Sequence, residues 1–173
     1  MDGWQPRMDA LTPPADAPSP QDRTALRNAL GRFATGVCVV TCAGETGPVG
    51  MTINSFASLS LDPPLIMWSP AKSSNRAKAF RAAPRFAIHV LKAEQRPIAD
   101  AFVKEADAFG ETLWRAAADG LPLIDRCLAR FVCDVVAEHD AGDHVIAVGR
   151  VTQMSAGEGA PLLFNRGRYA TLS

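Results

Sequence analysis

The stretch "GMTINSFASLSLDPPL", Gly50–Leu65, carries a single charged residue, Asp62, among its sixteen residues. Small hydroxyl and amide side chains alternate with apolar residues until Pro63 and Pro64 interrupt the pattern. Such alternation is typical of a β-strand with one buried face, and prolines are excluded from the interior of a sheet. The stretch therefore predicts strand structure that presents short, uncharged hydrogen-bonding groups.

Strands also dominate the sequence on both sides of this stretch, where β-branched and apolar residues recur between turn signals. We expect six or seven strands, in 36–43, 48–54, 64–69, 85–91, 129–140, 143–154 and 161–164. We expect at most three short helices, the first capped by Asp22 and ended by Gly36, the second capped by Ser73 or Ser74, the third in 93–104. Strands that are apolar on both faces need cover on both sides, and a closed barrel with helices or a second subunit outside provides it. The sequence thus predicts a mainly β protein.

The length and composition indicate one folded domain, in residues 22–173, preceded by a flexible tail, residues 1–21, that holds five of the 13 prolines. The 18 basic and 18 acidic residues balance, which argues against nucleic acid or an anionic membrane as partner. No apolar run approaches the ~20 residues of a membrane span, and no secretory signal is recognisable. We therefore expect a cytoplasmic protein.

The four cysteines lie among apolar or β-branched neighbours, at Cys38, Cys42, Cys127 and Cys133. A free cysteine in such surroundings behaves as a small hydrophobic residue. The last two can be combined with His139 and His144 into a zinc site, but the spacing matches no known zinc knuckle. We therefore expect core cysteines and no metal.

The sequence lacks the glycine-rich phosphate loops of common nucleotide-binding proteins. The edge of a flavin ring requires short neutral hydrogen-bonding groups, since nearby charges would disturb its redox chemistry. "TINSFASLS", residues 52–60, can supply such groups, and "KSSNR", residues 72–76, can hold a phosphate where a helix opens. The same segments are also compatible with an ordinary edge strand and a capped helix, so the residues alone leave both interpretations open.

The order of several motifs narrows this choice. "GRFATGVCVVT", "GMTINSFASLSLDPPL", "KSSN", "RFAIHVL", "GDHVIAVGRV" and "PLLFNRGRYATL" occur in sequence. Together they resemble the flavin reductase family, the small reductase components of two-component flavin-dependent monooxygenases. The resemblance covers roughly residues 24–172.

The resemblance implies a Greek-key split β-barrel that forms a homodimer. It also implies an oxidoreductase that oxidises NADH or NADPH and reduces FMN or FAD, which then leaves for a separate monooxygenase. Two alternatives remain: a flavoprotein that retains its flavin to reduce another substrate, and a non-catalytic barrel that binds flavin or haem.

The resemblance also assigns roles to particular residues. Contacts to the ring edge fall to Thr52, Asn54 and Ser55, and contacts along the ribityl chain to Ser58, Leu59 and Ser60. Contacts to the phosphate fall to Lys72, Ser74 and Asn75, although relatives often have Thr in place of Asn75. Thr35, Gly36 and Phe102 are expected around the same site, with Phe102 covering part of the flavin. Tyr169, which follows "NRGR", either contacts the nicotinamide at this site or only packs.

His144 of "GDH" matches the residue placed near the nicotinamide, and we expect it to act in catalysis. His89 lies within a predicted strand and is expected to be structural. Arg166 and Arg168 are either solvated or meet a pyridine-nucleotide phosphate. Relatives carry Asp-Arg-Phe where this chain has Ala108 in the central position, which leaves the preference among nicotinamide and flavin cofactors open.

Overall fold

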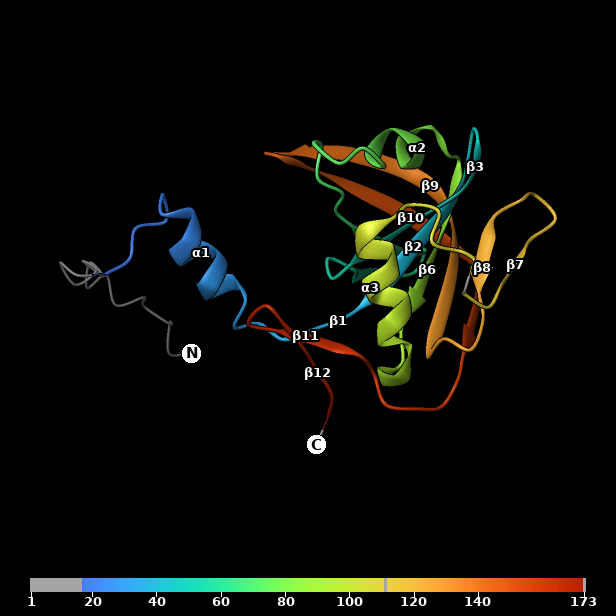
Figure 1. Cartoon of the computed structure of the whole chain (residues 1–173). Helices are drawn as coiled ribbons and strands as arrows, with labels where there is room; N and C mark the ends of the chain where they lie inside the picture. The colour runs from blue at the N-terminus through green and yellow to red at the C-terminus, as the bar shows by residue number, and fades with distance from the viewer. Residues whose placement is uncertain (1–16, 111, 173) are drawn as a thin grey trace, which may run out of the picture.

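The computed structural model describes residues 17–110 and 112–172, so most of the predicted tail lies outside the described residues. The described chain is mainly β, as predicted, and its largest sheet holds seven antiparallel strands in the order β3-β2-β6-β9-β10-β5-β4 (Figure 1). These strands are β2 (Cys38–Gly44), β3 (Gly47–Ile53), β4 (Ala57–Leu61), β5 (Pro64–Trp68), β6 (Arg85–Val90), β9 (Ala129–Ala141) and β10 (His144–Ala156). Two small sheets complete the fold, one of β1 (Thr35–Gly36), β11 (Leu163–Asn165) and β12 (Arg168–Ala170), the other of β7 (Trp114–Ala116) and β8 (Pro122–Ile124).

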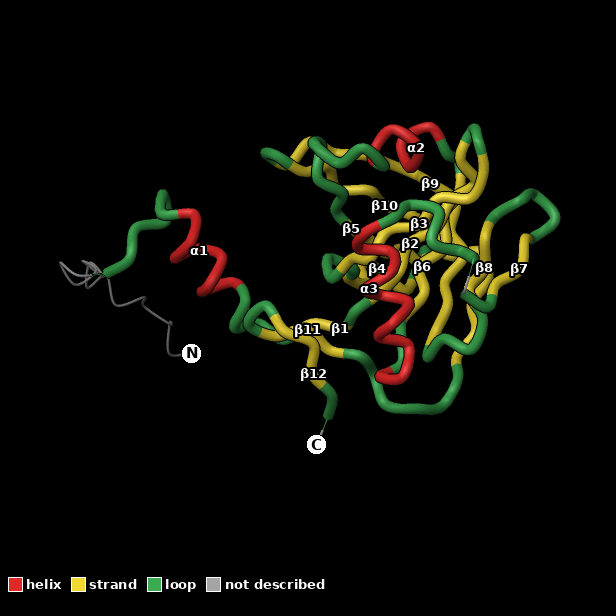
Figure 2. Tube along the Cα trace, viewed as in Figure 1, coloured by secondary structure: helices red, strands yellow, loops and turns green. Residues whose placement is uncertain are grey.

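The large sheet curls without closing, because β3 and β4 remain its two edges (Figure 2). The prediction of a closed barrel was therefore wrong, although the curled sheet is consistent with a split barrel. Strand β2 shows how both faces are covered instead. Val40 packs in one core cluster with Phe80 of helix α2 (Ala77–Ala82), and Val39 packs in another with Phe102 of helix α3 (Arg96–Lys104). The two faces of the large sheet are therefore covered by helices, and burial of both faces does not require a closed barrel.

Helix α1 (Arg23–Leu30) begins as the sequence predicted, with the Asp22 carboxylate accepting hydrogen bonds from two backbone N–H groups. It ends at Gly31, earlier than the predicted stop at Gly36, and none of its residues is buried. Figure 1 shows it standing away from the body of the protein. Its few contacts with the body include the N–H of Arg166, which donates to the Gly31 carbonyl at 2.8 Å.

Helix α2 begins later than predicted, at Ala77. The preceding residues form a turn in which the Ser74 carbonyl accepts from the Ala77 N–H at 3.0 Å. The Ser74 hydroxyl accepts from the Arg76 N–H at 3.3 Å, so it stabilises the turn and does not cap the helix. The prediction of a cap at Ser73 or Ser74 was therefore wrong.

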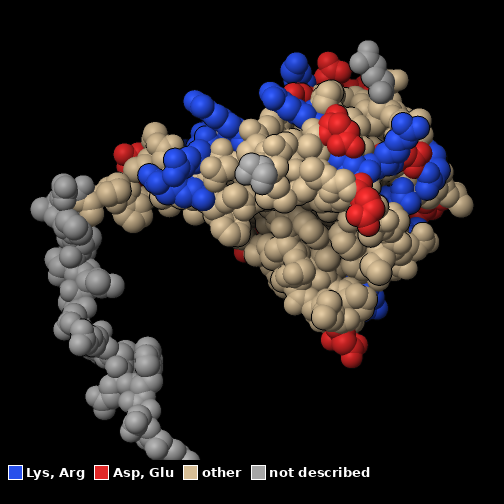
Figure 3. Space-filling model, turned by 90° about the horizontal axis from the view of Figure 1, so that it is seen from below, with Lys and Arg blue, Asp and Glu red and all other residues tan. Residues whose placement is uncertain are grey.

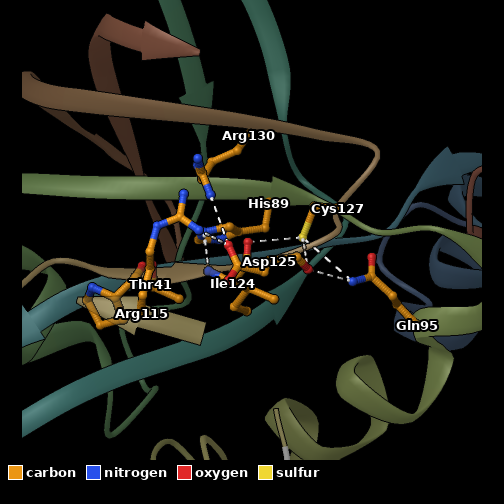
Figure 4. Close-up of polar contacts among 9 residues, drawn as sticks. Thr41, His89, Gln95, Arg115, Ile124, Asp125, Cys127 and Arg130 are labelled. Atoms are coloured by element: carbon orange, nitrogen blue, oxygen red, sulfur yellow. Dashed lines mark hydrogen bonds and ion pairs between the residues drawn. The ribbon is translucent and has the colours of Figure 1, made fainter. Parts of the chain in front are cut away.

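Three of the cysteines, Cys38, Cys42 and Cys133, are buried as predicted, and burial raises the pKa of each thiol to about 12. Cys127 is partly buried, and its thiol donates to the carbonyls of Ile124 and Asp125 (Figure 4). Within the described ranges no group of side chains is arranged to hold a metal ion. No helix in that part of the chain is long and apolar enough to cross a membrane.

Candidate functional site

Four hollows lie next to one another on the surface, since each shares lining residues with the next, and we call the series the groove. The first, of about 650 Å³, shares Ser74 and Asn75 with the third, of about 370 Å³. The third shares Thr52 and Val103 with the fourth, of about 170 Å³. The fourth shares Asn54 and Phe164 with the second, of about 610 Å³, which reaches α1. The groove therefore runs from α2, past the end of β3, to the foot of α1.

β3 and the residue that follows it bring uncharged polar side chains to the middle of the groove, which Arg76 also lines. Thr52 is half-buried, and its hydroxyl donates to the Ala99 carbonyl at 2.8 Å, which leaves the oxygen free to accept. Asn54 is exposed, and its side chain makes no hydrogen bond among the described residues. Ile53 between them is buried in the core, because successive side chains of a strand point to opposite faces. The alternation predicted for this stretch thus delivers two neutral polar groups to the groove.

The small sheet supplies the opposite wall of this middle part. Thr35 of β1 lines the hollow at α1, and its hydroxyl oxygen is buried without a hydrogen-bond partner in the described chain. Tyr169 of β12 lies edge-on to Phe164, and the Arg96 guanidinium lies 5.1 Å from the centre of its ring. Burial, together with the nearby Asp100 carboxylate, raises the pKa of Tyr169. Gly36 lies beside Thr35 on β1, but it is not among the residues that line the hollows.

At the α2 end, the groove is lined by three residues predicted to hold a phosphate: Lys72, Ser74 and Asn75. The Lys72 ammonium lies 3.1 Å from the Asp140 carboxylate, with side-chain exposures of 41% and 85%. An exposed pair of this kind is weak, so Lys72 can exchange Asp140 for another anion.

Arg76 belongs to the same predicted phosphate segment, but its side chain contacts the backbone of β3 and α3. Its guanidinium donates to the carbonyls of Phe102 and Val103 at the end of α3 and to that of Gly50 on β3. Burial lowers its pKa. Arg76 therefore joins the two elements that form the groove wall.

Several other predicted site residues do not line the groove of a single chain. The Ser55 hydroxyl accepts from the Ser69 N–H at 3.0 Å and donates to the Ser69 carbonyl at 3.4 Å, so it ties the loop after β3 to the end of β5. Ser58, Leu59 and Ser60 lie on the edge strand β4, where a bulge interrupts the pairing between Ser58 and Ser60. None of these four residues is among those that line the four hollows.

Phe102 also differs from its predicted role. Its side chain is fully buried, edge-on to Phe109 at a centroid distance of 4.9 Å. A flavin cannot contact the face of this ring, so Phe102 supports the groove wall from behind. The prediction that it covers a flavin was therefore wrong for the single chain.

His144 begins β10 and is half-exposed, with Nδ1 2.7 Å from the Asp143 carboxylate. This hydrogen bond lowers the pKa of Asp143. His144 pairs with Ala71, so it lies next to Lys72 and far along the chain from the ring-edge residues. His89, by contrast, is fully buried with both ring nitrogens hydrogen-bonded, which confirms its predicted structural role.

Sequence reasoning missed four residues at the α1 end of the groove, Arg27, Leu30, Arg32 and Phe33, and also Val103 of α3 in its middle. Figure 3 shows basic side chains gathered over α1. Leu30 and Phe33 recur at helical spacing, and nothing in that pattern indicates that they border a groove.

The groove combines uncharged polar side chains with several cations, so it has the chemistry to hold a ligand with a polar ring edge and an anionic tail. Comparison with known proteins agrees with this chemistry. The flavin reductase like domain family matches residues 30–173, so the chain belongs to that family. The chain is 49% identical over 156 residues to an FMN reductase (NADH) of Agrobacterium fabrum, covering 90% of each chain. It is 40% identical over 152 residues to the reductase subunit HsaB of a flavin-dependent monooxygenase of Mycobacterium tuberculosis, covering 86% of this chain and 81% of that subunit.

Solved structures show the same relationship. A nitrilotriacetate monooxygenase component B from Mycobacterium thermoresistibile superposes with a TM-score of 0.83 at 39% identity, covering 88% of each chain. An NADH:FAD oxidoreductase of Streptomyces globisporus superposes with a TM-score of 0.87 at 36% identity, covering 92% of this chain and 98% of that one. The predicted family and split-barrel class are confirmed, and the chain is an NAD(P)H-dependent flavin reductase.

Proposed function

We propose that this chain reduces a diffusible flavin with NADH and releases it to a separate monooxygenase. The observation that carries the proposal is the middle of the groove, where Thr52, Asn54 and Thr35 offer uncharged hydrogen-bonding atoms between the cations at its two ends. Several relatives are named as reductase components of monooxygenases, which supports the release of the product to a partner. The residues that line the four hollows include no histidine or cysteine, which disfavours the alternative of a haem-binding barrel.

The residues present fit a flavin. The hydroxyl oxygen of Thr35 is buried without a hydrogen-bond partner in the described chain, and an unpaired buried polar group lowers stability. A donor on a bound ligand would supply the missing hydrogen bond. The Asn54 amide can donate and accept at the ring edge, and the Thr52 oxygen can accept. Lys72, Ser74 and Asn75 would hold the phosphate.

When bound, flavin supplies the acceptor, and nicotinamide the donor, of the transferred hydride. The chain itself contributes positioning, because it fixes the two ends of the ligand through groups on different elements.

We assign His144 to positioning of the nicotinamide, on the basis of the "GDH" motif and of the Asp143 hydrogen bond that orients its ring. The variant His144→Gln is expected to slow flavin reduction in stopped-flow measurements between pH 5.5 and 8.5 while flavin affinity stays unchanged. Equal rates at every pH and NADH concentration would remove His144 from the reaction.

We also propose a homodimer. Leu26, Leu30 and Phe33 on and beside α1 are 43%, 67% and 78% exposed. A helix of eight residues is marginal in isolation, so this apolar face calls for cover by a second copy. The exposed Ser58 and Leu59 on β4 would then be free to reach the groove of the partner. The dimer is expected to bury more than ~1,200 Å² in total. A single 18.4 kDa species by light scattering would contradict it.

We place the enzyme in the reducing cytoplasm, because its four cysteines are unpaired thiols.

The decisive test of function is NADH and NADPH oxidation, each with FMN and with FAD, by protein freed of small molecules. We expect oxidation only when flavin is added. Oxidation by a tightly retained flavin, with no response to added flavin, would favour the prosthetic alternative. No oxidation under any combination would favour a binding protein without activity.

A further inference from the structure

The groove does not end at the residues assigned to the flavin phosphate. Beyond Ser74 and Asn75 it opens into the hollow of about 650 Å³, between α2 and the hairpin of β9 and β10. This volume is within the ~300–1,000 Å³ typical of small-molecule sites. We call the part of this hollow beyond Ser74 and Asn75, lined by Lys78, Arg81 and Glu138, the distal subsite. Its position makes it the place where a ligand longer than FMN would continue.

The charges of the distal subsite favour an anion. Lys78 and Arg81 are three residues apart on α2, so their side chains lie on the same face of the helix. The Arg81 guanidinium lies 3.2 Å from the Glu138 carboxylate, with side-chain exposures of 60% and 28%. No carboxylate lies within ion-pairing distance of Lys78 among the described residues. A phosphate can therefore meet Lys78 directly, and it has to compete with Glu138 for Arg81.

The other walls of the distal subsite are small and apolar, formed by Pro70, Ala82 and Val145. They offer contact area for a base but no aromatic ring on which a base could stack. Affinity for a nucleotide here would therefore depend mainly on the two cations, and it would fall as salt screens them.

We propose that the distal subsite binds the second phosphate and the adenosine of FAD. This inference rests on the proposed function. FMN ends at the single phosphate assigned to Lys72, Ser74 and Asn75, whereas FAD extends from that phosphate by one further phosphate and a nucleoside. The residues just beyond the inner phosphate therefore discriminate between the two flavins, and Lys78 and Arg81 favour FAD.

The proposal predicts opposite effects on FAD affinity for removing a positive charge and for removing a negative charge in the distal subsite. Isothermal titration calorimetry measures the affinity of the purified protein for FAD and for FMN, without any need for turnover. Lys78→Gln is expected to weaken FAD binding about three- to tenfold and to leave FMN binding within about twofold, because the lost contact is one partly exposed charge-assisted bond. Lys78→Arg, which keeps the charge, is expected to retain the affinity for FAD. Glu138→Gln frees Arg81 and is expected to strengthen FAD binding alone.

Arg150→Gln is the matched control, since Arg150 is an exposed cation on β10 outside the four hollows. It removes the same charge and is expected to change neither affinity. Equal weakening of FMN and FAD by Lys78→Gln would place Lys78 at the inner phosphate and overturn the proposal. An unchanged affinity for both flavins would also overturn it, as would an effect confined to the KM for NADH. If wild type binds neither flavin, the proposed function itself fails, whereas equal affinities with intact FMN reduction refute only the distal subsite.

Discussion

Acidification is expected to destabilise this protein through His89. The side chain is fully buried on β6, where Nδ1 lies 3.0 Å from the Val39 carbonyl of β2 and Nε2 accepts from the Ile124 N–H of β8 at 3.1 Å (Figure 4). This geometry requires a neutral ring with its proton on Nδ1. Burial is the main reason why the pKa of His89 falls to about 3, and the nearby Arg130 lowers it further.

The direction of the pH effect follows from the different pKa of His89 in the unfolded and folded chains. The unfolded chain takes up a proton on His89 below its ordinary pKa of 6.5, while the folded chain does not until about pH 3. The free energy of unfolding therefore falls as the pH drops through this window. Between pH 7 and pH 5 the loss is about 2 kcal/mol, at about 1.4 kcal/mol per pH unit below 6.5. That is a large fraction of the ~5–15 kcal/mol that stabilise a typical domain.

The assay is urea unfolding followed by circular dichroism at pH 8, 7, 6 and 5, for wild type and for His89→Gln. Glutamine does not titrate, so the difference between the two pH profiles isolates His89, whatever the absolute loss of stability in the variant. Wild type is expected to lose about 2 kcal/mol more than the variant between pH 7 and pH 5. Parallel profiles would refute the reasoning, since they would mean that His89 carries the same charge in both states.

Three further predictions concern the groove and the assembly. Gly50→Ala would place a Cβ 2.6 Å from Cδ1 of the buried Phe102, so we expect a loss of about 1–3 kcal/mol in thermal unfolding, partly recovered by adding Phe102→Leu. Full additivity of the two changes would contradict this contact. Asn54→Ala is expected to weaken flavin binding several-fold with unchanged melting temperature, by loss of a hydrogen bond worth about 0.5–1.5 kcal/mol, as measured by calorimetric titration. Leu30→Asp is expected to shift light scattering from the dimer toward 18.4 kDa, and an unchanged mass would place the interface elsewhere.

Features that depend on neighbouring residues could be predicted from the sequence. The Asp22 cap and the two long strands predicted in 129–140 and 143–154, which form β9 and β10, follow from local sequence patterns. The burial of Cys38 and Cys133 follows from the apolar strands that contain them. These predictions were correct because the information that determines them lies within a few residues in the chain.

The failures involve partners that are distant in the sequence. Ser55 had the right chemistry for a ring edge, but the Ser69 backbone, 14 residues away, already uses its hydroxyl. Phe102 had the right shape to cover a ring, but Gly50 leaves a space behind the strand that this ring fills. In each case the side chain could serve either role, and tertiary contacts decide between them.

Arg76 shows the same ambiguity for a charged side chain. A cation between Asn75 and Lys78 is an obvious candidate for a phosphate site, yet its guanidinium donates to the carbonyls of Phe102 and Val103. These carbonyls lie at the end of α3, where the helix leaves its last acceptors unpaired and its dipole attracts a positive charge. The guanidinium also lines the third hollow, beside Thr52 and Val103, so these hydrogen bonds fix the position of its charge without removing it. Arg76 therefore stabilises the wall between β3 and α3, whereas the exposed Lys72 at the α2 end is free to exchange its partner for a ligand anion.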